Sequence, residues 1–121
     1  LLAEDNIVNQ KVAQQMLLKL GCQADIAQNG KETVHLLHQR DYDLVFMDVQ
    51  MPELDGLEAT RQIRTLPALH QPYIIAMTAN AMMEDRSTCA EAGMDDFIAK
   101  PVRIGDVSAA LSRADQHLQQ H

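Results

Sequence analysis

The sequence lacks the features typical of proteins that bind nucleic acids, associate with membranes or are secreted. Lysine and arginine number 10 against 17 aspartates and glutamates, which gives a formal net charge of −7, and the cations are not clustered. Binding to nucleic acid regardless of sequence, or to an anionic membrane, needs clustered cations. No apolar run approaches the roughly 20 residues that span a bilayer, and no signal peptide is visible. We therefore expect a soluble, cytoplasmic domain that contacts neither nucleic acid nor membrane directly.

Cysteine is scarce, and glycine, proline and serine are nowhere concentrated. The two cysteines, Cys22 and Cys89, lack the spacing of a metal site, so we expect free thiols in a reducing compartment. Hydrophobic residues make up 46 % of the 121 residues. A chain of this length and composition can bury a core of its own. One compact domain over residues 1–121, without a linker, is predicted.

Strand-like and helix-like segments alternate along the chain. Apolar runs predict strands at residues 1–3, 22–27, 43–48, 73–77 and 96–99. Helices are expected after them, over residues 6–20, around 34–37, through 59–63, over 82–92 and over 104–118. Such a repeat with short connections favours an α/β fold, a doubly wound five-stranded parallel sheet with helices on both faces. The first strand falls short of the usual five or six residues, and we expect it to be truncated. Periodicity does not give the order of the strands.

Charged residues stand at the carboxyl ends of three predicted strands. Glu4 and Asp5 follow the first strand, Asp48 ends the third, and Lys100 follows the fifth. In open α/β sheets, ligands bind in the crevice beyond these ends. Two carboxylates about 6 Å apart repel by roughly 3 kcal/mol at an effective dielectric near 20, so three clustered acids without a cation would cost stability. Glu4 and Asp5 alone could be mere favourable charge at a helix N-terminus. The four residues together predict a pocket for a divalent cation and an anion.

Several short motifs fall at these strand ends in a fixed order. They comprise Glu4-Asp5-Asn6 with Asn9-Gln10, the run from Asp48 to Gly56, Met77-Thr78-Ala79, residues 92–97 and Lys100-Pro101. Through them the chain resembles the receiver domain of two-component response regulators, and most of all the C-terminal receiver of hybrid sensor histidine kinases. The resemblance covers nearly the whole chain. Each motif is weak alone, but their combination is specific, and it implies a flavodoxin-like fold of the receiver type.

The resemblance implies a phosphorelay function centred on Asp48. In this family an aspartate, here Asp48, accepts a phosphoryl group from a phosphohistidine, and the domain catalyses its own phosphorylation and dephosphorylation. Glu4 and Asp5, with Asp48 and the backbone carbonyl of Gln50, match the ligands of Mg²⁺ (or Mn²⁺). Many relatives carry two aspartates in place of Glu4-Asp5, so the longer Glu4 can act through a bound water. Lys100 matches the lysine that contacts the phosphoryl oxygens.

Other residues match the family's switch, its hydrolysis-tuning positions and its docking surface. Thr78 and Phe97 match the hydroxyl and the aromatic ring whose movement repacks the face of the fourth helix, fifth strand and fifth helix. Gln50 and Asn80 match the positions that tune hydrolysis of the acyl phosphate. The docking surface for the phosphodonor is expected to comprise Val8, Val12, Met16, Pro101 and Val102.

The resemblance also implies the partner and the setting. The expected partner is the phosphohistidine domain of a histidine kinase or a histidine phosphotransfer protein. We expect a monomeric domain, fused to a hybrid kinase that can itself be membrane-bound.

Three alternatives remain open at the level of sequence. A phosphate-independent interaction module would share the fold. It would not need the three acids, Thr78 and Lys100, so their presence together argues against this alternative. A hydrolase with an aspartyl-phosphate intermediate would want a second acid two residues after Asp48, where the chain has Gln50. A regulator that stands alone would carry the same motifs as a receiver within a hybrid kinase. The stimulus, the cognate donor, the phosphoryl lifetime and the output are not readable from the motifs.

Overall fold

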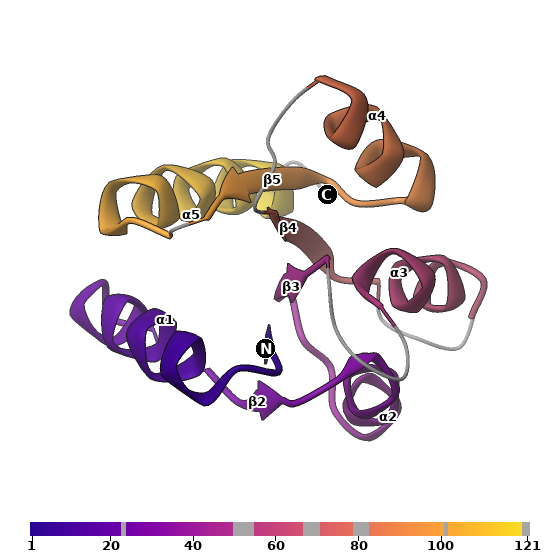
Figure 1. Ribbon diagram of the computed structural model, residues 1–121, viewed down its shortest axis with the longest axis horizontal. Coiled ribbons are helices and arrows are strands. Elements are labelled where there is room, and N and C mark those ends of the chain that lie inside the picture. Colours follow the sequence, from indigo (N-terminus) through magenta and orange to yellow (C-terminus); the bar gives the residue numbers. More distant parts are fainter. Residues whose placement is uncertain (23, 50–54, 67–70, 79–82, 101, 120–121) are drawn as a thin grey trace.

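A five-stranded parallel sheet forms the centre of the protein (Figure 1). The computed structural model describes residues 1–22, 24–49, 55–66, 71–78, 83–100 and 102–119. The strands are β1 (Leu2–Ala3), β2 (Ile26–Ala27), β3 (Leu44–Asp48), β4 (Tyr73–Thr78) and β5 (Asp96–Ala99). They lie in the order β2-β1-β3-β4-β5, and every neighbouring pair is parallel. Because β1 lies between β2 and β3, the residues that follow it face the middle of the carboxyl edge.

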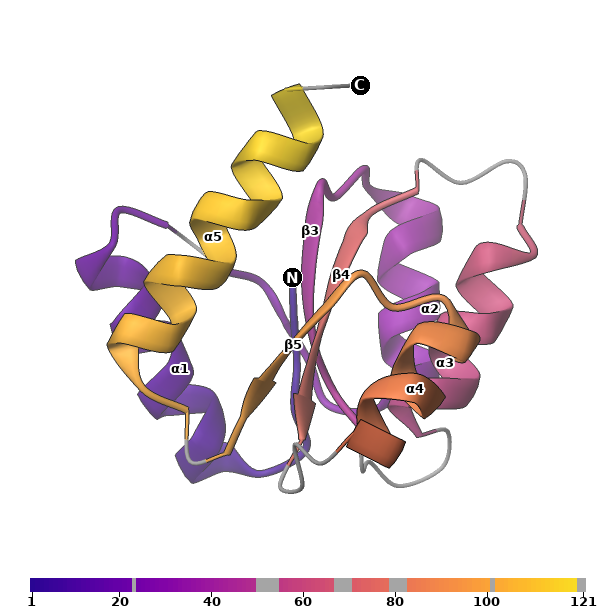
Figure 2. The same ribbon diagram turned by 90° about the horizontal axis from the view of Figure 1, so that it is seen from above.

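Helices cover both faces of this sheet (Figure 2). They are α1 (Ile7–Lys19), α2 (Gly30–Gln39), α3 (Gly56–Arg64), α4 (Met83–Ala92) and α5 (Ile104–Gln119). Helices α1 and α5 lie on one side of the sheet, and α2, α3 and α4 lie on the other. The predicted doubly wound α/β fold is therefore confirmed. In the described part of the chain, no helix combines the length and apolar character needed to cross a membrane.

Strand β3 contributes to the core on both faces of the sheet. Val45 and Met47 belong to the cluster packed against α2 and α3, whereas Phe46 belongs to the cluster packed against α1 and α5. Successive side chains of a strand point to opposite faces, so a central strand covered on both sides must be apolar throughout. The residues that precede Asp48 are therefore apolar because helices cover both faces of β3. Asp48 follows at the end of this strand.

Side-chain caps fix where three helices begin. Asn6, Asn29 and Asp55 each accept hydrogen bonds from backbone N–H groups in the first turn of α1, α2 and α3, respectively. These caps satisfy N–H groups that have no partner within the helix. Gly21, just beyond α1, has φ 83°, a left-handed conformation that glycine adopts readily. The starts of α1, α2 and α3 are therefore set by contacts within a few residues of each cap.

One local expectation differs from the structure. The second strand, predicted over residues 22–27, spans Ile26–Ala27 in the described part of that range, because its partner β1 pairs with it at two positions, Leu2↔Ile26 and Ala3↔Ala27. A strand on the edge of a sheet extends only as far as its neighbour offers hydrogen bonds. The first and fifth helices and the fifth strand begin or end within a few residues of their predicted bounds.

Candidate functional site

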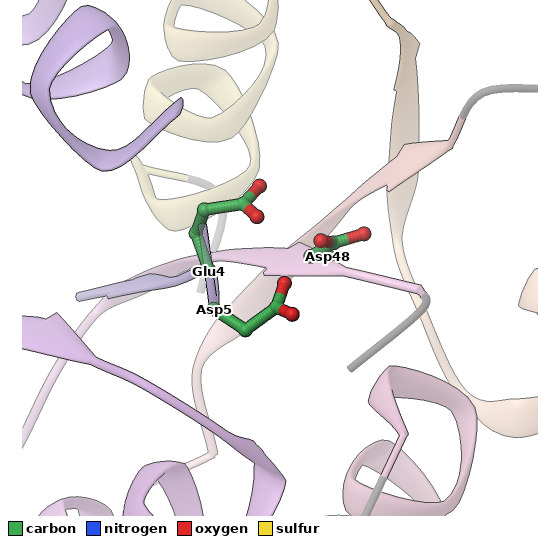
Figure 3. A group of neighbouring side chains, drawn as sticks. All are labelled: Glu4, Asp5 and Asp48. Carbon is green, nitrogen blue, oxygen red and sulfur yellow. The ribbon is translucent and has the colours of Figure 1, made fainter. Parts of the chain in front are cut away.

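Three carboxylates converge at the carboxyl edge of the sheet (Figure 3). Ala3 pairs with Met47, so the next residues along, Glu4 and Asp48, lie side by side at the ends of β1 and β3. Carboxylate oxygens of Glu4, Asp5 and Asp48 all lie within 4.8 Å of one another. Glu4 and Asp48 are each 2 % exposed, whereas Asp5 is exposed to solvent. The acids that sequence analysis selected therefore form one cluster, open to solvent on the side of Asp5.

Lys100 supplies the positive charge that faces this cluster. Its Nζ lies 2.9 Å from Asp48 Oδ1 and 3.4 Å from Glu4 Oε2. The backbone N–H of Lys100 donates to the carbonyl of Thr78, which fixes the end of β5 beside β4. Partial burial lowers the pKa of Lys100, but the hydrogen bond and charge of Asp48, together with Glu4, raise it above its ordinary value overall. Lys100 is therefore a permanent cation at this edge, placed to offset one of the acids.

The ionisation of Glu4 is strongly perturbed. Its pKa is raised overall from 4.5 to about 7, and burial is the main cause. The backbone N–H of Asn6 and the charge of Lys100 lower this pKa, whereas the charge and hydrogen bond of Asp48 raise it. Without a cation, Glu4 is therefore substantially protonated near neutral pH. A divalent cation would displace that proton, because carboxylates bind metals in their ionised form. The clustered oxygens are the hard donors that Mg²⁺ prefers. The donor set thus fits such an ion.

Glu4 is held in place by its backbone as well as its side chain. Its N–H donates to the carbonyl of Ala27 at 3.0 Å, and its own carbonyl accepts from Nε2 of Gln10 at 2.6 Å. The N–H of Asn6 donates to Glu4 Oε1 at 3.2 Å. Gln10 belongs to the motifs that carry the family resemblance, but sequence analysis assigned it no role. The signal that could have found it is a polar residue on the inward stripe of α1, where Gln10, Ala13 and Leu17 are buried.

Gly56 touches the backbone of the proposed acceptor. Its N–H donates to the carbonyl of Val49, and a β-carbon added to Gly56 would collide with the carbonyl oxygen of Asp48. A side chain at this position would have to displace the end of β3 or the start of α3. Gly56 was part of the motif that carried the family resemblance. The structure explains why glycine stands there, because there is no room for a β-carbon.

The predicted switch residues lie on strands beside the cluster. Thr78 is buried at the end of β4, whose neighbour β3 ends in Asp48. Phe97, on β5, pairs with Ala76 and is half-buried against the core beneath α2 and α3. Thr78 therefore lies on the strand next to Asp48, and Phe97 lies on the strand that Lys100 follows. The predicted positions Gln50, Asn80 and Pro101 lie outside the described residues.

The predicted docking residues on α1 are largely accessible. Val8 is 68 % and Val12 45 % exposed, while Met16 and Val102 are half-buried. Ile7, which sequence analysis did not select, adds a further exposed apolar side chain at 63 %. A cavity of about 500 Å³ extends from this surface to the acids, lined by Glu4, Asn9, Val12, Ala13, Met77, Lys100 and Val102. Apolar side chains on α1 and the charged cluster therefore share one open recess.

Fold and site together define a class of protein. The strand order β2-β1-β3-β4-β5, with acids and a lysine at the carboxyl edge beside the first strand, is that of a doubly wound sheet with its ligand site at the switch point. The family model described as "Response regulator receiver domain" matches residues 1–112. The chain belongs to the response regulator receiver family.

Individual relatives agree with this assignment. Hybrid signal transduction histidine kinase K of Dictyostelium discoideum is 41 % identical over 128 residues, which is 100 % of this chain and 11 % of the relative. Histidine protein kinase 1 of Candida albicans is 40 % identical over 96 % of this chain and 5 % of its own length. The chain thus spans only about a tenth of these curated relatives or less. The predicted similarity to receivers of hybrid kinases is confirmed.

Solved structures of receivers share the fold at appreciable identity. The receiver domain of the sensor histidine kinase PA1611 from Pseudomonas aeruginosa PAO1, with magnesium coordinated in its active-site cleft, has a TM-score of 0.84 and 41 % identity, covering 93 % of this chain and 92 % of that one. The receiver of the response regulator Ssk1 from Saccharomyces cerevisiae, crystallised with the histidine phosphotransfer protein Ypd1, gives 0.80 and 31 %, covering 88 % and 81 %. Receivers of this kind therefore provide both a metal-bound and a partner-bound comparison.

Proposed function

We propose that this receiver accepts a phosphoryl group from a phosphohistidine onto Asp48 in a reaction that requires Mg²⁺. The observation that carries the proposal is the position of Lys100 Nζ, 2.9 Å from Asp48 Oδ1, beside carboxylates clustered within 4.8 Å. Glu4, Asp5 and Asp48 would hold the ion, with the backbone carbonyl of Gln50 as a further ligand. The magnesium in the cleft of the PA1611 receiver supports this assignment.

Phosphoryl transfer depends mainly on positioning the reacting groups and neutralising their charge, and the protein supplies little covalent chemistry. A carboxylate oxygen of Asp48 forms a bond to phosphorus as the phosphorus–nitrogen bond of the donor breaks, and the electron pair stays on the imidazole nitrogen. A bound divalent cation supplies charge neutralisation for the phosphoryl oxygens. Lys100 adds a second positive charge at the same oxygens, and the burial of Asp48 strengthens that interaction. Hydrolysis of the acyl phosphate would be tuned by Gln50 and Asn80.

Phosphorylation would then shift the domain between two conformations. The hydroxyl of Thr78 and the ammonium group of Lys100 would contact the new phosphoryl group, and Phe97 would turn toward the space that Thr78 leaves. Because Thr78 and Phe97 lie on adjacent strands, movement of one alters the packing of the other. The result would be a repacked face of α4, β5 and α5, which favours a minor conformer already present in the ensemble.

The partner would be a phosphohistidine domain of a histidine kinase or a histidine phosphotransfer protein. Val8, Val12 and Met16 on α1, with Pro101 and Val102, would form the docking surface. The exposure of the two valines supports this, as does the Ssk1 receiver, which was crystallised with Ypd1. We further propose that the domain is a monomer within the cytoplasmic part of a hybrid histidine kinase.

The test is the intact mass of the protein after incubation with Mg²⁺ and acetyl phosphate, run beside Asp48→Asn. One added phosphoryl group in the wild type, absent from the variant and from a sample with chelator, would support the proposal. No adduct on a folded wild type that binds Mg²⁺ would contradict it and favour the phosphate-independent interaction module.

A further inference from the structure

We infer that Gln10 is the residue through which helix α1 positions the metal-binding acids. The inference rests on the proposed Mg²⁺ site, and it concerns a side chain that touches neither the ion nor the phosphoryl group. Gln10 is 7 % exposed and lies on the face of α1 that packs against the sheet, in line with Ala13 and Leu17. A buried amide among apolar neighbours is costly unless its hydrogen bonds are made.

The partner of the Gln10 amide is the backbone of Glu4. Nε2 of Gln10 donates to the carbonyl oxygen of Glu4 at 2.6 Å, a buried hydrogen bond across six residues. On the other side, the N–H of Glu4 donates to the carbonyl of Ala27 in β2. Glu4 is therefore held from the sheet through its N–H and from α1 through its carbonyl. The bond from Gln10 holds the peptide group that joins Glu4 to Asp5, and the bond to Ala27 holds the peptide group that precedes Glu4.

Asn6 completes this arrangement. Its N–H donates to Glu4 Oε1, its side chain caps α1, and its carbonyl accepts from the N–H of Gln10 at 2.9 Å. Glu4, Asn6 and Gln10 thus form a closed set of hydrogen bonds around the turn between β1 and α1. Asn6 restrains the carboxylate of Glu4, whereas Gln10 restrains its backbone. Since Asp5 lies between Glu4 and Asn6, its exposed carboxylate depends on the same turn for its direction.

Removal of the Gln10 donor should therefore make the positions of Glu4 and Asp5 less fixed, while both carboxylates remain present. Groups that orient metal ligands typically change metal affinity by about 10- to 100-fold when they are mutated. Gln10→Met keeps the length and burial of the side chain and loses the N–H donor. The chain offers a matched control in Gln14, whose Nε2 donates to the carbonyl of Ala24 at 3.4 Å from the next turn of the same helix, away from the acids.

The experiment is calorimetric titration of Mg²⁺ into wild type, Gln10→Met and Gln14→Met, each shown to be folded. We expect the dissociation constant to rise about tenfold in Gln10→Met and to stay within about twofold in Gln14→Met. At saturating Mg²⁺, phosphorylation of Gln10→Met by acetyl phosphate should return to nearly the wild-type rate, because the acids and Lys100 remain. An unchanged dissociation constant in Gln10→Met, with Mg²⁺ binding and phosphorylation normal in the wild type, overturns the inference alone. A wild type that does not bind Mg²⁺ overturns the metal site as well.

A second variant distinguishes the effect of side-chain length from the effect of a polar group at this position. It also provides a test if Gln10→Met does not fold. Gln10→Asn keeps a buried amide but shortens it by one methylene, which withdraws the donor from the Glu4 carbonyl. A positioning role predicts weakened Mg²⁺ binding in Gln10→Asn as well. Wild-type affinity in Gln10→Asn would mean that only a polar group is needed there, and it would refute the positioning role.

Discussion

Glu4 is expected to destabilise the metal-free protein, and Glu4→Gln should show this as a gain in stability that depends on pH. Its folded-state pKa, about 7, lies above the ordinary value of 4.5, so the native state binds more protons than the unfolded state between these values. The free energy of unfolding of the wild type must then fall as pH rises through this window. A rise in pKa from 4.5 to about 7 is equivalent to about 3 kcal/mol at most. Gln cannot ionise, yet it can still accept from the N–H of Asn6.

The assay is urea unfolding of wild type and Glu4→Gln in the presence of chelator, at pH 4.5 and pH 8. We expect nearly equal stability at pH 4.5 and a gain of about 2–3 kcal/mol for the variant at pH 8. Excess Mg²⁺ should reverse the order, because a ligand that binds only the native state stabilises the protein that binds it better. Glu91→Gln, which removes an exposed carboxylate of α4, is the control and should change little at either pH. A difference between wild type and Glu4→Gln that is the same at both pH values would refute the reasoning.

Three further substitutions test other parts of the site. Asp5→Asn should weaken Mg²⁺ binding at least about tenfold in a calorimetric titration while stability in chelator hardly changes, and equal affinity would remove this exposed acid from the site. Lys100→Met should slow phosphorylation by acetyl phosphate about 100-fold, followed by intact mass, and a wild-type rate would show that the contact with Asp48 has no catalytic role. Gly56→Ala should lower the free energy of unfolding by about 1–3 kcal/mol because the added carbon meets the Asp48 carbonyl. Gly105→Ala, whose added carbon meets nothing, should not be destabilised, and equal losses in both would contradict the steric explanation.

The parts of the site that follow local patterns could be predicted from the sequence. Asp48 and Lys100 each end an apolar run, and an apolar run in a layered α/β domain becomes a strand whose end lies at the carboxyl edge. Convergence of these residues with Glu4 and Asp5 then follows from parallel pairing. The strand order had to come from the family resemblance or the structure, because periodicity describes each element and not its neighbours.

What escaped prediction depends on contacts between elements. Gln10 was part of a motif, but its role could not be predicted, because its amide meets the Glu4 carbonyl only when α1 packs beside the end of β1. The second strand is shorter than its apolar run because hydrogen bonding is limited by β1. In each case the deciding partner lies in another part of the chain.

The layout of the site has a consequence for when the domain becomes competent during its synthesis. Within the domain, Glu4 and Asp5 are synthesised before Asp48, and Lys100 appears only after nearly the whole sheet has been made. β1 gains both its neighbours only once β2 and β3 are in place, and Lys100 reaches Asp48 only when β5 has joined β4. A nascent or partly unfolded chain therefore carries Asp48, the proposed acceptor, without the groups that would make it reactive. On the proposed function, immature copies of the domain should remain unphosphorylated.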